Sequence, residues 1–279
     1  MTTTRILEYF SSLMADDESL PLTEAALSIA QDAYPDLDMP AVLAEIDELV
    51  VRARRRIPDD ADVKQKVDSF NRYFFLDLGF SSNLNDYYDS DNSYLNVVLR
   101  RRRGISILLA VVYLEMADQL GMPVRGVSFP GHFLLRVSMP EHDLMLDPTN
   151  GQTLSEAQMV EMLEPYVQRV GESIGSALRV LLQPATKREI VVRMLRNLKG
   201  IYLQTQRWQR LLAVQQRLVI ALPGSIEEVR DRGFAYARLD YLRSALEDLE
   251  RYIEVRPDAE DATAVETELH ELRQRTQND

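Results

Sequence analysis

The chain has 279 residues, 46% hydrophobic and 27% charged, a composition typical of a globular protein with one large domain or two modest ones. Its 44 acidic residues outnumber 32 basic ones, and the net charge of −12 disfavours non-specific binding to nucleic acid or to an anionic membrane. The absence of cysteine excludes a thiol nucleophile and disulfide bonds, and we expect a cytoplasmic protein.

The first 79 residues have the apolar spacing of consecutive helices. Pro35 must end or kink one of them, because proline cannot continue a helix without losing a hydrogen bond. Gly79 is placed to end the last of them in a left-handed conformation. Helices are therefore expected over residues 6–13, 23–34, 40–53 and 63–74.

The pattern changes in the middle of the chain. Residues 81–93 are polar and predict a long structured loop, and a short helix is expected over 95–102. Residues 106–120 are apolar almost all round, which is typical of a helix buried inside a domain. Ser155 and Gln158 form a predicted capping box that opens a further helix. Between these helices, three short strands are expected, over residues 124–129, 132–137 and 144–146.

The C-terminal part is expected to be entirely helical and repetitive. Thr186 and Glu189 form a second predicted capping box. Further on, Tyr202 and Tyr236 are 34 positions apart, as are Pro223 and Pro257. In the second copy, the small and aromatic residues of a helix-turn-helix unit are present: Gly233, Phe234, Ala235, Tyr236 and Ala245, with Leu249 packed behind them. This period and pattern resemble the tetratricopeptide repeat (TPR).

Three residues of the middle segment form a candidate catalytic triad. Ser106 begins the buried helix, where the positive end of the helix dipole stabilises an anion. His132 opens a predicted strand and could take the proton of a nucleophile. Asp147 ends the next strand and could orient His132 and stabilise its charged form.

The order and spacing of these residues resemble the transglutaminase-like superfamily of papain-type Cys-His-Asp enzymes. The resemblance runs from Gly104 to Gly151 and includes Gly121-Met122-Pro123-Val124-Arg125 and Asp147-Pro148-Thr149. Tyr87-Tyr88-Asp89, residues 92–99 and residues 126–134 look like a bacterial branch, the invasion-regulator-like (Sir-type) proteins, which join a transglutaminase-like core to C-terminal TPR. The family implies a fold more than a reaction.

The nucleophilic cysteine of the family falls on Ser106. A serine hydroxyl is far more basic than a thiol and reacts only with full base assistance and a dedicated oxyanion hole. For Ser106, a structural role as the N-cap or as a first-turn serine that satisfies free amides is favoured over a role as nucleophile. For His132 beside Asp147, a structural and a functional role are both open. His142 and His270 are expected to be exposed, and no metal site or cofactor is indicated.

Two arginine runs, Arg52–Arg56 and Arg100–Arg103, depart from the acidic balance. We interpret them as solvated helix ends, where cations complement the helix dipole, in preference to a phosphate site. A regulator linked to nucleic acid through Arg100–Arg103 is the weakest of three functional hypotheses, because the net charge opposes it.

The sequence thus predicts an α+β protein, mostly helical, with a transglutaminase-like core in which a buried helix packs on a small antiparallel sheet. Residues 1–183 are expected to form the N-terminal helices and this core (core motifs about 80–160), and residues 184–279 the TPR-like helical repeats. The favoured function is a non-catalytic scaffold that binds a protein or peptide partner through the repeats. The alternative is a serine-dependent amide or ester hydrolase or acyltransferase that uses Ser106, His132 and Asp147.

Overall fold

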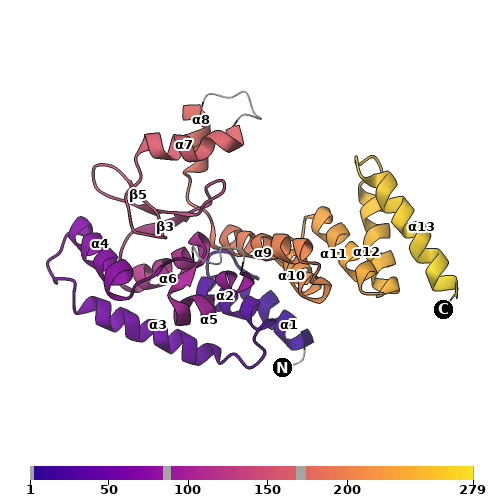
Figure 1. Ribbon diagram of the computed structural model, residues 1–279, viewed down its shortest axis with the longest axis horizontal. Coiled ribbons are helices and arrows are strands. Elements are labelled where there is room, and N and C mark those ends of the chain that lie inside the picture. The colour runs from indigo at the N-terminus through magenta and orange to yellow at the C-terminus, as the bar shows by residue number, and fades with distance from the viewer. Residues whose placement is uncertain (1–2, 84–88, 168–173, 279) are drawn as a thin grey trace. The chain divides into compact units, whose positions relative to one another are not determined.

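The computed structural model describes residues 3–83, 89–167 and 174–278 (Figure 1). The chain divides into two compact units. We call Asp16–Met194 the core unit, and Met1–Ala15 together with Leu195–Asp279 the repeat unit. The predicted domain boundary near residue 184 stays a proposal. In the described ranges, no helix is both long enough and apolar enough to cross a lipid bilayer.

The core unit contains the helices that precede the sheet, the sheet itself, and the helices that follow it. The preceding helices are α2 (Leu22–Ala30), α3 (Met39–Arg54), α4 (Val63–Asn71) with a π-helical extension over Arg72–Asp77, α5 (Leu95–Arg101) and α6 (Ser106–Gln119). The strands β3 (Val124–Val127), β4 (Leu134–Val137) and β5 (Leu144–Leu146) form an antiparallel sheet in chain order. The following helices are α7 (Glu156–Val167), α8 (Ile174–Leu181) and the start of α9 (Lys187–Gln204).

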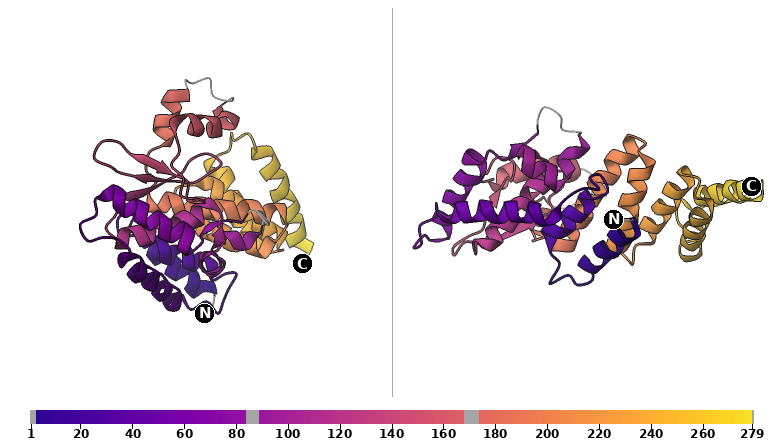
Figure 2. Two further views of the ribbon diagram at one scale, coloured as in Figure 1. Left: turned by 60° about the vertical axis from the view of Figure 1, so that its left-hand side comes forward. Right: turned by 90° about the horizontal axis from the view of Figure 1, so that it is seen from below.

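The sheet lies between two helical layers. Helix α6, whose residues Ile107–Tyr113 are all buried, packs against β3 and β4 on one face. Helices α7 and α8 cover the other face, as Figures 1 and 2 show from two directions. There, Val127, Leu134 and Met145 from the three strands pack with Met159 and Leu163 of α7. The predicted α+β architecture, with a buried helix on a small antiparallel sheet, is confirmed.

Local capping signals in the sequence set several helix ends. The Ser155–Gln158 box forms as predicted. The backbone N–H of Ser155 donates to Gln158 Oε1 (2.9 Å), and the backbone N–H of Gln158 donates to Ser155 Oγ (3.3 Å). The Thr186–Glu189 box at the start of α9 is also present, at 2.7 and 3.2 Å. Gly79 has the predicted left-handed conformation, with φ of +73°.

Several expectations about element bounds were wrong. The helix over residues 23–34 ends at Ala30, and the strand over 124–129 ends at Val127. The helix over residues 63–74 ends at Asn71 and continues as a π-helix, in which Tyr73 and Phe74 are buried. The segment 81–93 is not all loop, because Ser81–Ser82 (β1) pairs in parallel with Arg103–Gly104 (β2) and Ser90–Ser93 is 3-10 helical. The second strand begins at Leu134 instead of His132, because the turn at Gly131 keeps His132 and Phe133 out of the β3–β4 ladder.

The repeat unit consists of α1 (Thr3–Leu13), most of α9, α10 (Trp208–Ala221), α11 (Ile226–Arg238), α12 (Leu242–Val255) and α13 (Ala262–Asn278). The predicted 34-residue repeat is visible in the backbone, since Gln206 and Asp240, 34 positions apart, share a left-handed conformation between paired helices. A Cβ atom at Gly233 would lie 2.8 Å from Leu249, so glycine permits the close approach of α11 to α12. The helical repeat prediction is therefore confirmed.

Candidate functional site

The start of α6 is held close to α5 by a glycine. A Cβ atom at Gly104 would lie 2.6 Å from Cγ2 of the buried Val98, so a side chain there would push the two segments apart. Ile105 is the N-cap of α6 and Ser106 is its first residue. Ser106 is thus a first-turn serine, and the N-cap role that the sequence also allowed is excluded.

The hydroxyl of Ser106 bonds to the neighbouring strand region. Its Oγ accepts a hydrogen bond from the backbone N–H of Phe133 at 3.1 Å. Phe133 is fully buried, so water cannot satisfy its amide. Ser106 therefore satisfies a free amide, as the structural interpretation expects, but the amide belongs to the segment before β4 and not to its own helix.

His132 is positioned by the turn before β4. Gly131 has φ of +70°, a conformation that L-residues rarely adopt, and an added Cβ there would meet the hydroxyl of Tyr166 on α7. The turn directs the imidazole toward the end of β5, where His132 Nε2 lies 3.0 Å from Asp147 Oδ1. Both side chains are partly buried, at 23% and 16% exposure.

Asp147 is fixed by hydrogen bonds within its own turn as well as by His132. Its Oδ1 also accepts from the backbone N–H of Thr149 at 2.8 Å and from the Thr149 hydroxyl at 2.7 Å. Burial opposes ionisation of this carboxyl, but the hydrogen bonds from His132 and Thr149 outweigh it and hold the pKa of Asp147 below its usual value. The carboxylate is therefore ionised at neutral pH and can keep the imidazole in one orientation.

Arg193 of α9 also holds the histidine segment, and sequence reasoning missed it. Its guanidinium donates to the His132 carbonyl oxygen and to Ser128 Oγ, both at 2.8 Å, and lies over the Phe133 ring. Burial lowers the pKa of Arg193 from its usual value. The capping box that opens α9 places the helix start, but no local signal links Arg193 to a carbonyl 61 positions earlier.

The structure brings the three predicted residues into one region but does not join all of them. Ser106 binds the amide of Phe133, the residue next to His132, whereas the imidazole binds Asp147. Among the residues that the structure describes, no hydrogen bond links Ser106 Oγ to the His132 ring. Because Nε2 is engaged with Asp147, a nucleophile would have to use Nδ1.

Comparison with known proteins identifies the family to which the chain is similar. The family model described as transglutaminase-like superfamily matches residues 40–196, more than half of the chain, and a tetratricopeptide repeat model matches residues 198–270.

The chain belongs to the transglutaminase-like superfamily.

Its relatives match over nearly the whole length. The chain is 41% identical to a protein called UPF0162 of Xylella fastidiosa over 92% of each sequence. It is 27% identical to protein SirB1 of Salmonella typhimurium, over 88% of this chain and 91% of that protein. The resemblance to Sir-type proteins with C-terminal TPR is therefore confirmed. A solved structure of menin superposes with a TM-score of 0.42 at 12% identity, over 97% of this chain and 74% of menin, which is too remote to inform function.

The remaining candidate groups do not extend the site. His142 and His270 are exposed, as expected. Within the described part of the chain, no three His, Cys, Asp or Glu side chains are grouped so that they could hold a metal ion. Tyr87 and Tyr88, which contribute to the family resemblance, lie outside the described residues.

Two arginines of the second run form ion pairs within the core unit. Arg101, the last residue of α5, binds Asp89 and Asp91 at 2.9 and 3.0 Å. Arg102 binds Glu45 at 3.0 Å. Because carboxylates already neutralise these cations, the run agrees with a helix end better than with a phosphate site.

Proposed function

We propose that this protein is a non-catalytic member of the transglutaminase-like superfamily that acts as a scaffold and binds a protein or peptide partner through its TPR region. The observation that carries the proposal is the hydrogen bond from the Phe133 amide to Ser106 Oγ. At the position where the family resemblance expects a thiol, the side chain is a weakly acidic hydroxyl whose oxygen is used as a structural acceptor. We keep the cytoplasm as the proposed location.

The repeats support the binding half of the proposal. The TPR model covers residues 198–270, and such repeats commonly present surfaces for other proteins. Residues such as Ala245 and Leu249 are buried in the hydrophobic core of the repeat and are not accessible to a partner. Binding therefore depends on residues outside this packing, on the surfaces that α9, α10 and α11 leave open.

A serine-dependent hydrolase or acyltransferase is the second candidate. It is favoured by the His132–Asp147 pair, in which the bond through Nε2 leaves Nδ1 for a proton transfer. It also needs Ser106 Oγ to turn from the Phe133 amide toward the imidazole, at the cost of leaving a buried N–H without its acceptor.

Labelling with a fluorophosphonate probe tests the choice between the two. The full chain should remain unlabelled while a serine hydrolase in the same reaction is labelled fully. The control variants are Ser106→Ala and His132→Ala. Labelling of the wild-type chain that disappears in both variants would overturn the non-catalytic proposal.

A further inference from the structure

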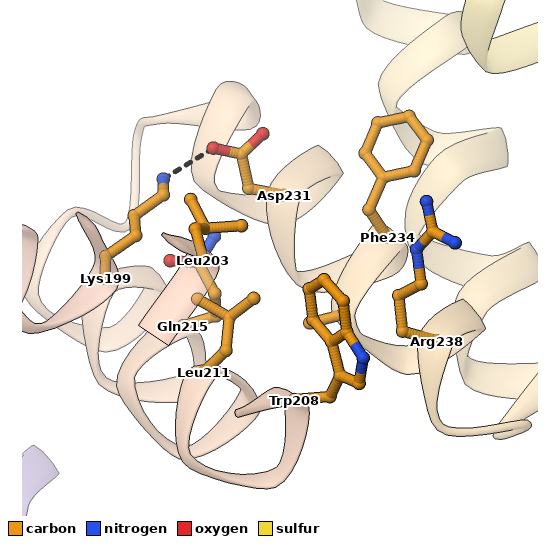
Figure 3. A pocket seen from close by; sticks show the side chains of 9 residues that line it. Lys199, Leu203, Trp208, Leu211, Gln215, Asp231, Phe234 and Arg238 are labelled. Carbon is orange, nitrogen blue, oxygen red and sulfur yellow. Dashed lines mark hydrogen bonds and ion pairs between the residues drawn. The ribbon is translucent and has the colours of Figure 1, made fainter. Parts of the chain in front are cut away.

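An apolar groove of about 280 Å³ lies in the repeat unit, among α9, α10 and α11 (Figure 3). Its lining includes Leu203, Trp208, Leu211 and Phe234. Leu203 is 47% exposed, so the groove is open to solvent and a partner can reach it. Apolar side chains that water contacts are stabilised when another apolar group covers them. The groove therefore favours a partner that supplies an apolar side chain.

The segment that forms α9 and α10 is basic, although the chain as a whole has a net charge of −12. Between Glu189 and Glu227 the sequence has no acidic residue. The same stretch contains six cationic side chains, those of Arg193, Arg196, Lys199, Arg207, Arg210 and Arg217. A local region of one charge attracts partners of the opposite charge. Two of the three helices around the groove thus belong to the part of the chain that best suits a negatively charged partner.

The positive charge around the groove is unpaired at one end only. At the other end, Lys199 is paired with Asp231 (Figure 3). The guanidinium of the exposed Arg238 lies over the Trp208 ring, 5.6 Å from its centroid. Arg207, the N-cap of α10 and the residue before Trp208, is also exposed. Within the described ranges of the chain, neither Arg207 nor Arg238 has a carboxylate partner.

We infer that this groove binds an acidic segment of a protein partner. The inference deepens the proposed partner-binding role and rests on it. An apolar side chain of the segment lies on the leucines of the groove, and carboxylates beside it pair with Arg207 and Arg238. A guanidinium suits this task because it can bind a carboxylate through two parallel hydrogen bonds. A nucleic acid also supplies negative charge, but it has no aliphatic side chain to cover Leu203 and Leu211.

Trp208 is the single tryptophan of the chain, so its fluorescence reports directly on the groove. The probe is the peptide acetyl-Gly-Glu-Leu-Leu-Glu-Gly-amide, added to the full-length protein. We expect a saturable change in Trp208 emission. The apparent affinity should fall as salt is added, because salt screens exposed ion pairs.

Two control peptides separate the charge from the apolar contact. One carries lysine in place of both glutamates, and the other carries serine in place of both leucines. Each should bind at least about 5-fold more weakly than the acidic leucine peptide, because each lacks one of the two interactions. No response of Trp208 to the acidic leucine peptide, or equal affinity for either control, overturns the inference.

Charge reversal locates the ion pairs. Arg207→Glu together with Arg238→Glu should weaken the acidic leucine peptide by about 5- to 25-fold, as the loss of two exposed ion pairs predicts. The matched control is Arg243→Glu together with Arg251→Glu, on exposed residues of α12 outside the groove, and should keep the wild-type affinity. An equal loss in both double variants would show that only the overall charge matters and would overturn the site.

A single variant keeps this test available if the double variant does not fold. Arg207→Glu places a carboxylate at the start of α10, where the helix dipole favours it, so the fold should tolerate the change. It should weaken the acidic leucine peptide by about 2- to 5-fold. Unchanged affinity in this variant would exclude Arg207 from the site and contradict the inference.

Two other occupants are distinguished by further measurements. Sedimentation of the protein alone tests a second copy of the chain, and titration with a short oligothymidylate tests nucleic acid. A dimer that Arg207→Glu with Arg238→Glu dissociates would assign the groove to a second copy. A saturable response to the oligonucleotide that the same variant removes would assign it to nucleic acid. Either result overturns the inference, whereas a monomer that ignores the oligonucleotide supports it.

The two proposals can fail separately. An unresponsive Trp208 in a chain that a fluorophosphonate does not label removes the acidic-partner site and leaves the non-catalytic role intact. Conversely, labelling at Ser106 overturns the non-catalytic role, whatever the fluorescence shows.

Discussion

At the scale of single residues, the chemistry of the site depends on what Ser106 Oγ accepts. In the structure, it accepts from the amide of Phe133, and it does so at the first turn of a buried helix. A nucleophile and a structural acceptor make different demands on the same oxygen. The stability of variants separates these roles without requiring a substrate.

Ser106→Ala should destabilise the protein by about 1–3 kcal/mol, because the buried N–H of Phe133 loses its acceptor. Urea unfolding of the wild type and the variant measures the difference. Ser106→Thr keeps the hydroxyl and should retain more of the stability than Ser106→Ala. A fully stable Ser106→Ala would indicate that the bond has no structural importance.

The ionised Asp147 predicts a specific pH dependence. Its pKa is lowered in the folded protein, so its stabilisation is complete above the unfolded-state value of about 3.9 and is lost as the pH falls below that value toward the folded-state pKa. Asp147→Asn has no such titration. In urea unfolding, the free energy of unfolding of the wild type should exceed that of the variant by about 1 kcal/mol near neutral pH. This gap should shrink below about pH 4. A gap that is constant down to pH 3 would contradict this.

At the scale of elements, the position of α6 depends on its contact with α5 at Gly104. Gly104→Ala should destabilise the core unit by about 1–3 kcal/mol, because the new methyl overlaps the buried Val98. The double variant Gly104→Ala with Val98→Ala removes the overlapping atoms and should recover part of the loss. Additive losses in thermal unfolding of the three variants would show that the two residues are not in contact.

The same scale explains what could be predicted from the sequence. The capping boxes at Ser155 and Thr186 involve residues three positions apart, and the period of 34 leaves its mark on consecutive helices, so both were predicted correctly. The predicted start of β4 is two residues too early, because the alternation of apolar residues does not show how far the left-handed turn at Gly131 extends. The contacts of Arg193 with His132 and of Ser106 with Phe133 join distant segments, and only the assembled core brings them together.

At the scale of the whole molecule, the two units differ in how many segments of the chain form them. The core unit is continuous, whereas the repeat unit combines α1 with helices from the other end of the sequence. Phe10 of α1 is completely buried, and the guanidinium of Arg217 on α10 lies 5.4 Å from its ring centroid. Phe10 therefore belongs to the core of the repeat unit.

Phe10→Ala should consequently lower the stability of the repeat unit by about 3–5 kcal/mol, the usual cost of truncating a buried phenylalanine. Amide hydrogen exchange measured by mass spectrometry distinguishes the units. Protection should fall in α10 and α11 and be largely kept in α6 and β4. Equal loss of protection in both units would argue against two separately stable units. The exposed Tyr9 provides a neighbouring control as Tyr9→Ala.

This shared core has a consequence for synthesis on the ribosome. Helix α1 is made about 200 residues before α10, the helix on which it packs. At roughly 5–20 residues per second, its apolar face, with Ile6 and Phe10, waits about 10–40 s for its partner. The core unit can fold during this interval, but the repeat unit cannot close before α10 has emerged. A nascent chain of this protein therefore carries an uncovered apolar helix through most of its translation, and it is in this period that chaperones would encounter it.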